Sequence, residues 1–271
     1  MISALARSGR VLGRSEDLSA ANQAVDFINR RLYDGASGEL YRRWREGEAG
    51  IAAMADDYAF LAQGLIDLYE AGFEPWHLQW AIELMGRFAE RFVDPSSGAV
   101  YLTPEAHDRL LVFTMKDVAD NVTPSAASAA ARNLVRLSRI TGLQDFETTA
   151  EHIFRSVADQ VTDSPKIAPY LLTAVMIHRA RHVHMVISGS DNSADTARMV
   201  ETGRQKGGLG HSMVRVADTA QRDRLAGLIP EVGAMHVPES GAAAQVCLDR
   251  SCRPPVDTPE KLARQLEAGY A

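Results

Sequence analysis

Three stretches of the chain carry apolar residues at helical spacing, which indicates helices with one buried and one solvated face. They begin after Gly13, Gly72 and Gly142. In the first stretch the apolar stripe consists of Leu18, Ala21, Val25, Ile28 and Leu32. The first two stretches end in DGASGELY and DPSSGAVY, where turn residues precede a short extended segment. We therefore predict three amphipathic helices, two of them followed by tight turns.

Between these stretches lie helical segments that are apolar or small on every side. The clearest are DDYAFLAQGLIDLYEAG and TPSAASAAARNLVRLSRITG, and MISALARSGRVLG and KIAPYLLTAVMIHRA have the same character. A helix without a polar face must be covered all round. Alternation of buried and half-buried helices, with a period of roughly 60 to 70 residues, is typical of an α/α barrel. The pattern predicts part of such a barrel over residues 1–182.

From residue 183 onward the periodicity changes. VHMVISG, HSMVRVAD and AAAQVCLD have the length and composition of strands, whereas SADTARMVETGRQK and TPEKLARQLEAGY indicate helices. A strand, a helix and a second strand in succession predict at least one parallel strand pair. The expected fold class is therefore mainly α, with a partial α/α barrel over 1–182 followed by a small α/β domain over 183–271.

Composition and charge exclude several classes of function. The chain has 271 residues, 46% of them apolar, and a formal net charge of −6. Because no basic stripe is present, we expect no nucleic-acid partner. No stretch reaches the roughly 20 apolar residues that span a bilayer, and the first residues do not form a signal peptide, so we expect no membrane association and a cytoplasmic location. No phosphate-binding glycine motif is present either, and no cofactor is predicted.

Polar side chains precede two of the predicted buried helices. The N-termini of the inner helices of an α/α barrel meet at one rim, so these side chains are expected to face a common pocket. The alternative is that they only cap their helices, which by itself stabilises a helix by about 0.5–2 kcal/mol. Thr123 is the predicted N-cap of the second helix, with Pro124 at its first position. The residues concerned are Asp56, Asp57, Asp117, Asp120 and Asn121.

Four segments, in order, give the chain a resemblance to a known family. They are ISALARSGRVLG, AGIAAMADDYAFLAQGLIDLYEAGFEP, DNVTPSAASAAARNLVRLSRITG and VCLDRSCRPPVDTPEKL. The chain resembles the C-terminal part of thioredoxin-domain-containing proteins, which include the spermatogenesis-associated thioredoxin-like proteins. The resemblance implies a six-hairpin glycosidase-like α/α barrel similar to N-acylglucosamine 2-epimerase. It also implies that this chain begins inside the barrel, after the family's thioredoxin-like domain.

The barrel that the resemblance implies predicts a role in carbohydrate metabolism, and the chain matches the family at Asp56, Asp57, Tyr58, Ser125 and Ser128. Proton transfer on a sugar needs carboxylates, and aromatic rings stack on pyranose faces. Asp57 and Asp120 are the predicted catalytic residues. The chain departs from the family at Ala126 and Ala127, where the family has Gly-Asn. The predicted substrate-binding residues are Trp44, Asp56, Tyr58, Asp117, Asn121 and Ser125.

Each of these assignments has a structural alternative. Trp44 would then pack against a loop, and Arg42 and Arg43 would pair with the acids. Among the histidines, His77, His107 and His152 are expected to face solvent. His178, His182 and His184 cluster near the domain junction, where a metal site is the less favoured interpretation, and no metal is predicted.

The two cysteines, Cys247 and Cys252, have four residues between them. This spacing differs from the redox C-x-x-C motif, and two thiols do not complete a structural zinc site. Free structural thiols are the favoured interpretation, and a reversible disulfide is the next.

Two functions follow from these observations. The first is enzymatic: a longer protein that contains this chain acts on a carbohydrate or polyol by epimerisation or isomerisation, and the chain alone is inactive. The second is a non-catalytic binding or scaffold module that works with a thioredoxin-like domain. In both cases an open barrel edge predicts self-association or a partner chain that carries the missing half of the barrel.

Overall fold

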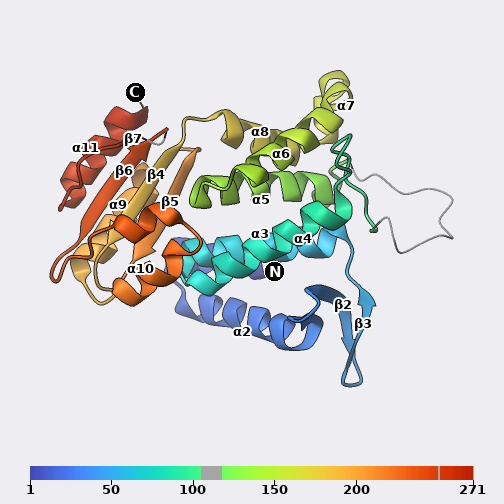
Figure 1. Cartoon of the computed structure of the whole chain (residues 1–271), viewed down its shortest axis with the longest axis horizontal. Coiled ribbons are helices and arrows are strands. Elements are labelled where there is room, and N and C mark those ends of the chain that lie inside the picture. The colour runs from blue at the N-terminus through green and yellow to red at the C-terminus, as the bar shows by residue number, and fades with distance from the viewer. Residues whose placement is uncertain (105–117, 250, 271) are drawn as a thin grey trace. The chain divides into compact units, whose positions relative to one another are not determined.

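The computed structural model describes residues 1–104, 118–249 and 251–270 (Figure 1). These residues are mainly helical and contain one sheet of three strands and one of four. It divides into two compact units: unit 1 comprises Met1–Val135 and Asp145–Val175, and unit 2 comprises Arg136–Gln144 and Met176–Ala271. The predicted combination of a mainly α fold with a small α/β part is confirmed. The predicted boundary between residues 182 and 183 stays a prediction.

Unit 1 contains the helices in the first part of the chain and the three-stranded sheet. The last residues of α5 and α8 belong to unit 2. The elements are α1 (Ile2–Leu12), α2 (Ser15–Leu32), β1 (Tyr33–Asp34), β2 (Glu39–Arg45), β3 (Glu48–Ala52), α3 (Ala55–Gly72), α4 (Pro75–Phe92), α5 (Ala126–Thr141), α6 (Gln144–Ser156), α7 (Ala158–Asp163), η1 (Pro165–Ile167) and α8 (Pro169–Arg179).

Helix α3 is the centre of unit 1. It is buried on most sides, whereas the preceding amphipathic helix α2 buries only Asp17, Ala21 and Val25. Helices α1 and α4 pack against α3. Asn133 of α5 donates to the carbonyl oxygen of Ala59 in α3 at 2.7 Å. The alternation of buried and half-buried helices is therefore present, and its continuation into an α/α barrel stays a prediction.

A buried carboxylate fixes α1 against α3. Asp67 of α3 is 3% exposed and accepts hydrogen bonds from the Ser3 hydroxyl and, at 3.0 Å, from Nε of Arg7. One turn earlier, Gly64 allows a close approach, because a Cβ at this position would lie 3.0 Å from Cγ2 of Ile2. These two contacts set the position of the N-terminal end of α1.

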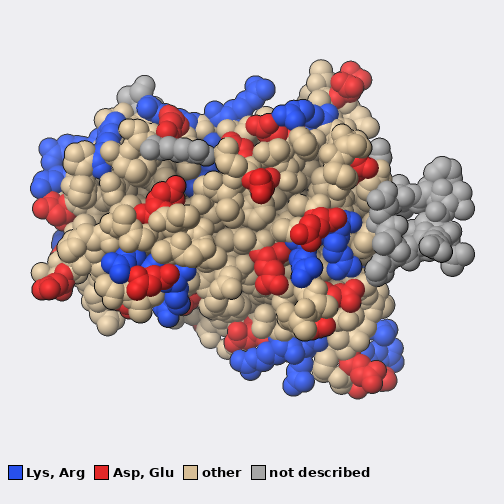
Figure 2. All heavy atoms as spheres, in the orientation of Figure 1, with Lys and Arg blue, Asp and Glu red and all other residues tan. Residues whose placement is uncertain are grey.

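A small antiparallel sheet follows α2. Strand β2 pairs with both β1 and β3, and the β2–β3 hairpin turns through Glu46 and Gly47, both with positive φ. Positive φ at both turn residues is typical of the type I′ hairpin turn. Because side chains alternate along a strand, Arg42 and Arg43 lie on opposite faces of β2. Figure 2 shows acidic and basic side chains interspersed over the described part of one face of the chain.

Unit 2 contains the four-stranded sheet and the helices that follow its strands. Residues 136–144, which include the end of α5, belong to the same unit. The elements are β4 (Val183–Ser188), α9 (Ala194–Lys206), β5 (His211–Val216), α10 (Thr219–Ala226), η2 (Pro230–Ala234), β6 (Ala243–Leu248), β7 (Ser251–Cys252) and α11 (Pro259–Tyr270).

The strands of unit 2 have the order β5-β4-β6-β7. Strands β4 and β5 are parallel, as predicted, while β6 is antiparallel to both β4 and β7. Helices α9 and α11 contact each other and pack on β4 and β6, whereas α10 contacts β5. The turn between β4 and α9 contains no cysteine.

We expect Asp67→Ala to lower the free energy of unfolding by about 1–3 kcal/mol, because it removes a buried carboxylate that accepts hydrogen bonds from a hydroxyl and a guanidinium group. Glu70→Ala on the same helix is the matched control. Its partner is Arg10 at 3.1 Å, the Glu70 side chain is far more exposed than that of Asp67, and the expected loss is below about 1 kcal/mol. Urea unfolding measures both losses, and equal losses would contradict the role given to Asp67.

Candidate functional site

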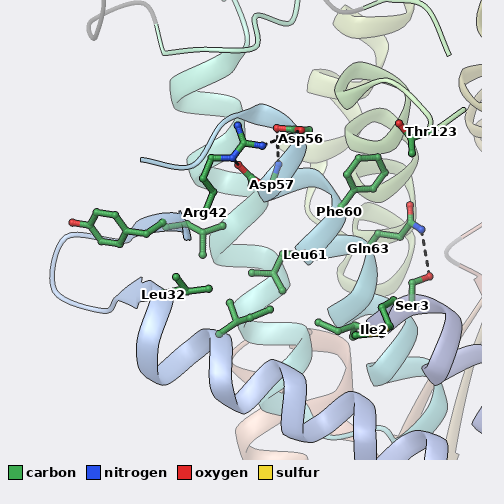
Figure 3. Close-up of a pocket in the computed structure, with 14 residues that line it drawn as sticks. Ile2, Ser3, Leu32, Arg42, Asp56, Asp57, Phe60, Leu61, Gln63 and Thr123 are labelled. Carbon is green, nitrogen blue, oxygen red and sulfur yellow. Dashed lines mark hydrogen bonds and ion pairs between the residues drawn. The ribbon is translucent and has the colours of Figure 1, made fainter. Parts of the chain in front are cut away.

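Unit 1 contains a pocket of about 490 Å³ (Figure 3). Helices α1, α2 and α3, strand β2 and the segment before α5 supply its wall. A pocket of this volume, with an apolar floor and a few polar groups, is typical of small-molecule sites. The apolar lining residues are Met1, Ile2, Ile28, Leu32, Leu40, Phe60 and Leu61. The polar lining residues are Ser3, Tyr41, Arg42, Asp56, Asp57, Gln63 and Thr123.

Three charged side chains lie together on one side of this pocket. Nε of Arg42 is 3.2 Å from Oδ2 of Asp57, and a terminal nitrogen of Arg42 is 3.7 Å from Oδ2 of Asp56. Figure 3 shows the guanidinium of β2 against the two carboxylates at the start of α3. All three side chains are partly exposed, so they keep access to solvent. The arrangement places hydrogen-bond donors and acceptors side by side.

Asp57 has both a structural and a chemical role open to it. Its Oδ2 accepts the N–H of Met54 at 2.9 Å and so caps α3. Burial raises the pKa of Asp57, and the charge of Asp56 acts in the same direction. The Met54 hydrogen bond and Arg42 oppose this shift without cancelling it. A carboxyl group with a raised pKa in a pocket wall is suited to proton transfer.

Gln63 is a pocket residue that the sequence did not single out for function. Its Nε2 is 3.3 Å from the Ser3 hydroxyl, and its Oε1 accepts the Tyr170 hydroxyl at 2.9 Å. The guanidinium of Arg132 lies 5.5 Å from the centre of the Tyr170 ring. These contacts orient the amide of Gln63 on the wall. The sequence feature that could have indicated this role of Gln63 is a single amide side chain in a helix that is otherwise mostly apolar.

The two predicted aromatic residues lie outside the lining of this pocket. Tyr58 is completely buried, and its hydroxyl accepts the N–H of Leu40 at 3.1 Å and a guanidinium N–H of Arg91 at 3.1 Å. Trp44 lies on β2 with the guanidinium of Arg31 5.2 Å from its ring centre. Tyr58 thus joins β2 to α3, and Trp44 packs with α2.

Asp120 is used at two helix starts. Its Oδ1 accepts the N–H of Ser125 at 2.8 Å, and its Oδ2 accepts the N–H of Tyr170 at 2.7 Å. Both oxygens therefore serve backbone donors at the beginnings of α5 and α8. Asn121 is exposed and contacts the carbonyl oxygen of Ala119 at 3.4 Å. Asp117 lies outside the described residues.

The predicted N-cap of α5 is wrong by two positions. The helix begins at Ala126, and the hydroxyl of Ser125 accepts the N–H of Ser128 at 3.1 Å. Ser125 is thus the N-cap and is 3% exposed, and its role in substrate binding stays a prediction. Thr123 lies earlier, in the loop, where it lines the pocket. The helix begins later than predicted because the N–H of Ser125 binds Asp120 and not Thr123, the predicted cap.

Two further expectations are corrected. Cys247 and Cys252 form a disulfide, because β6 and β7 place them directly opposite each other, so the free-thiol interpretation is wrong. His77 is 1% exposed instead of facing solvent, and its ring lies 4.2 Å from that of Trp76. Burial lowers the pKa of His77 to about 4. His107 lies outside the described residues.

Among the His, Cys, Asp and Glu side chains of residues 1–104, 118–249 and 251–270, no group of three or more is arranged to hold a metal ion. No helix in these ranges has both the length and the apolar character needed to cross a membrane.

The chain is similar to proteins named spermatogenesis-associated protein 20. It is 28% identical to the human protein and 26% identical to the mouse protein over 274 residues, which is 98% of this chain and 35% of each relative. It is also 29% identical to uncharacterized protein B0495.5 of Caenorhabditis elegans over 188 residues, which is 66% of this chain and 25% of that protein. No family model matches the chain.

These similarities support the relation to spermatogenesis-associated proteins that the four segments indicated. The chain spans about a third of the length of the first of these relatives. The likeness to the barrel of N-acylglucosamine 2-epimerase stays a prediction.

We expect the effect of Asp57→Asn on stability to depend on pH. Asparagine still accepts the Met54 N–H but does not ionise. The folded pKa of Asp57 lies above the unfolded value of about 3.9. Its contribution to stability is therefore complete below pH ~3.9 and is lost as pH rises through the folded pKa. Urea unfolding at a series of pH values should show that the free energy of unfolding of the variant increases relative to that of the wild type as pH rises through this window.

Asp94→Asn provides a control of opposite sign. Hydrogen bonds from the hydroxyl of Ser96 and from the N–H and hydroxyl of Ser97 lower the pKa of Asp94 to about 2. The stability that Asp94 contributes is lost only as pH falls from about 3.9 toward 2. A pH-independent difference for Asp57→Asn would contradict the raised pKa.

Proposed function

We propose that the pocket of unit 1 binds a small hydroxylated molecule, a carbohydrate or polyol, in a longer protein similar to spermatogenesis-associated protein 20. The observation that carries the proposal is the group Arg42, Asp56 and Asp57 beside an apolar floor. Carboxylates and guanidinium groups pair with hydroxyls, while the floor accepts the C–H face of a sugar ring. Gln63 and Thr123 add further donors and acceptors on the same wall.

Within this proposal, Asp57 is the candidate for proton transfer in an epimerisation or isomerisation. Its raised pKa favours this role over that of a permanently charged partner of Arg42. Asp120 is less suited to catalysis, since both of its carboxylate oxygens accept backbone hydrogen bonds. Its place in the mechanism is to fix the loop that brings Thr123 to the pocket.

The second candidate function is non-catalytic binding in support of a thioredoxin-like domain. It is favoured by the structural use of Asp120 and Tyr58, two residues predicted to act on substrate. The two functions differ in what Asp57→Asn does. In an enzyme the variant retains ligand binding and loses turnover in the longer protein, whereas in a binding module it changes affinity alone.

Ligand-detected NMR with a panel of hexoses, N-acetylated amino sugars and polyols tests the proposal on this chain. We expect Arg42→Met to weaken binding of the ligand found by at least about tenfold, because it removes hydrogen bonds from a charged group to the ligand, which contribute roughly 1.5–3 kcal/mol each. Arg45→Met is the matched control on the same strand, since Arg45 is exposed and absent from the pocket lining. Equal affinities for the two variants, or binding of no member of the panel, would count against the proposal.

Self-association or pairing with a half-barrel chain is a further part of the proposal. Large apolar side chains are exposed on α1 and α2, among them Val11 at 73%, Leu12 at 65% and Phe27 at 47%. Contiguous exposed apolar surface is typical of interaction sites, and these side chains are the candidates for such a surface. Light scattering should therefore give a mass above the 29.6 kDa of one chain. A monomer at all concentrations would contradict self-association.

A further inference from the structure

A row of four residues crosses the whole sheet of unit 2. The strand register places Ser212 of β5 opposite His184 of β4, His184 opposite Cys247 of β6, and Cys247 opposite Cys252 of β7. Directly opposite residues project from the same face, with Cβ atoms about 4.5–5.5 Å apart. A hydroxyl, an imidazole and a disulfide are therefore neighbours in one line. None of them belongs to the pocket of unit 1.

The hydrogen bonds of Ser212 determine the tautomer of His184. The Ser212 hydroxyl lies 2.8 Å from the carbonyl oxygen of Arg139, 2.7 Å from Nδ1 of His184 and 2.9 Å from Nε2 of His182. A hydroxyl has one hydrogen to donate, and a carbonyl oxygen can only accept. The hydrogen therefore goes to Arg139, and both imidazoles donate to the hydroxyl oxygen. It follows that Nδ1 of His184 carries a hydrogen and Nε2 carries a free lone pair.

The free nitrogen of His184 faces no acceptor or donor. Nε2 is buried and has no hydrogen-bond partner among the residues that the structure describes. Burial lowers the pKa of His184 to about 4, so the ring is neutral at neutral pH and Nε2 can accept a hydrogen bond. The side chain across from His184 on β6 is Cys247. Because β5 and β6 flank β4, Cys247 lies on the side of His184 away from Ser212.

The two sulfur atoms differ in access. Cys247 is 7% exposed, whereas Cys252 is exposed at the edge of the sheet. An external thiolate therefore reaches Cys252 and not Cys247. Sγ of Cys252 is therefore the sulfur that is attacked, and Sγ of Cys247 is the sulfur that leaves.

The hairpin that holds the cysteines does not depend on the disulfide. The N–H of Arg253 donates to the carbonyl oxygen of Val246 at 2.9 Å, and Ala244 and Val256 exchange two backbone hydrogen bonds of 2.7 and 2.8 Å. The guanidinium of Arg253 also binds the carbonyl oxygen of Gln265 in α11 at 2.9 Å. The cysteines are only five positions apart, and a disulfide that closes a short loop removes little chain entropy. Reduction therefore leaves both thiols facing each other in a folded unit.

We propose that Cys247 and Cys252 form a thiol–disulfide exchange site that takes electrons from an external dithiol, with His184 as the proton acceptor of Cys247. The site lies in unit 2 and does not depend on the function proposed for unit 1. Its substrate class is a dithiol, and its product is the corresponding disulfide.

Exchange proceeds in two displacements. One thiolate of the dithiol attacks Sγ of Cys252, and the bond to Cys247 breaks with its electron pair on Sγ of Cys247, which takes up a proton. The second thiolate of the dithiol then attacks the first sulfur of the dithiol, which is bonded to Sγ of Cys252. The dithiol closes to a disulfide, and Cys252 leaves and takes up the second proton. Two electrons and two protons pass from the dithiol to the protein.

In the reverse direction Cys247 must lose its proton to attack. The thiolate is the nucleophile, and an apolar environment disfavours it. Nε2 of His184 accepts the proton, and the hydrogen bond from Nδ1 to Ser212 holds the ring in place. His184 thus accelerates oxidation of the reduced pair.

The first experiment uses the unaltered chain. It is equilibrated with mixtures of reduced and oxidised dithiothreitol, alkylated, and weighed by mass spectrometry, while circular dichroism follows the fold. We expect one reversible transition between no free thiol and two, with the folded spectrum retained. Thiols that persist in oxidised dithiothreitol, a disulfide that is reduced only in denaturant, or unfolding on reduction would each overturn the proposal.

Reduced thioredoxin, used as a protein dithiol, distinguishes two sources of electrons. If thioredoxin reduces the disulfide faster than dithiothreitol at equal concentration, the exchange site takes its electrons from a protein dithiol. If thioredoxin is not faster, the site takes its electrons from a small-molecule dithiol. Failure of both probes to reduce the folded chain would overturn the proposal.

Two variants test His184 separately from the fold. His184→Asn keeps a donor for Ser212 and removes the second nitrogen, and His184→Gln places an amide near the position of Nε2. We expect both variants to slow oxidation of the reduced chain by oxidised dithiothreitol by at least about tenfold, because an amide at either position cannot take up the proton of Cys247. Thermal unfolding of both reduced variants shows whether they are folded. Equal oxidation rates in the folded variants and the wild type would remove His184 from the mechanism.

Discussion

The pocket of unit 1 depends on the way one buried carboxylate holds α1 against α3. Asp67 accepts from Ser3 and Arg7, and Gly64 allows the backbone of α1 to come close. The N-terminal residues of α1 consequently form one wall of the pocket, opposite the start of α3 and the strand that carries Arg42. A buried charge is tolerated in α3 only because it has these partners. The polar part of the site is thus positioned by polar contacts deeper in the same helix.

The polar residues near the helix starts divide into two groups. Asp120 and Ser125 satisfy backbone N–H groups, which any buried helix start requires. Asp57 does so with one oxygen while still contacting Arg42 in the pocket wall. Capping and ligand recognition use the same residue types at the same places. A helix start rich in Asp, Asn and Ser therefore indicates a pocket only when its side chains can still bind a ligand after accepting hydrogen bonds from backbone N–H groups.

Unit 2 shows how strand register can assemble chemistry from distant residues. Ser212, His184, Cys247 and Cys252 come from four strands, and Ser212 and His184 are far from the two cysteines along the chain. Their alignment follows from one parallel and two antiparallel pairings. A shift of one residue in any pairing would move one of them to the opposite face. The sheet, and not any local motif, brings the imidazole to the disulfide.

The sequence by itself determined the mainly α class, the alternation of buried and half-buried helices, the small α/β part and its parallel strand pair. It did so because periodicity records which face of each element is buried. It also marked Asp56 and Asp57. Tertiary structure alone decided that Tyr58 is buried, that Ser125 caps α5, that Gln63 lines the pocket and that the cysteines are bonded. These outcomes depend on which residues from other elements compete for the same hydrogen bonds and the same space, and single-chain patterns do not contain that information.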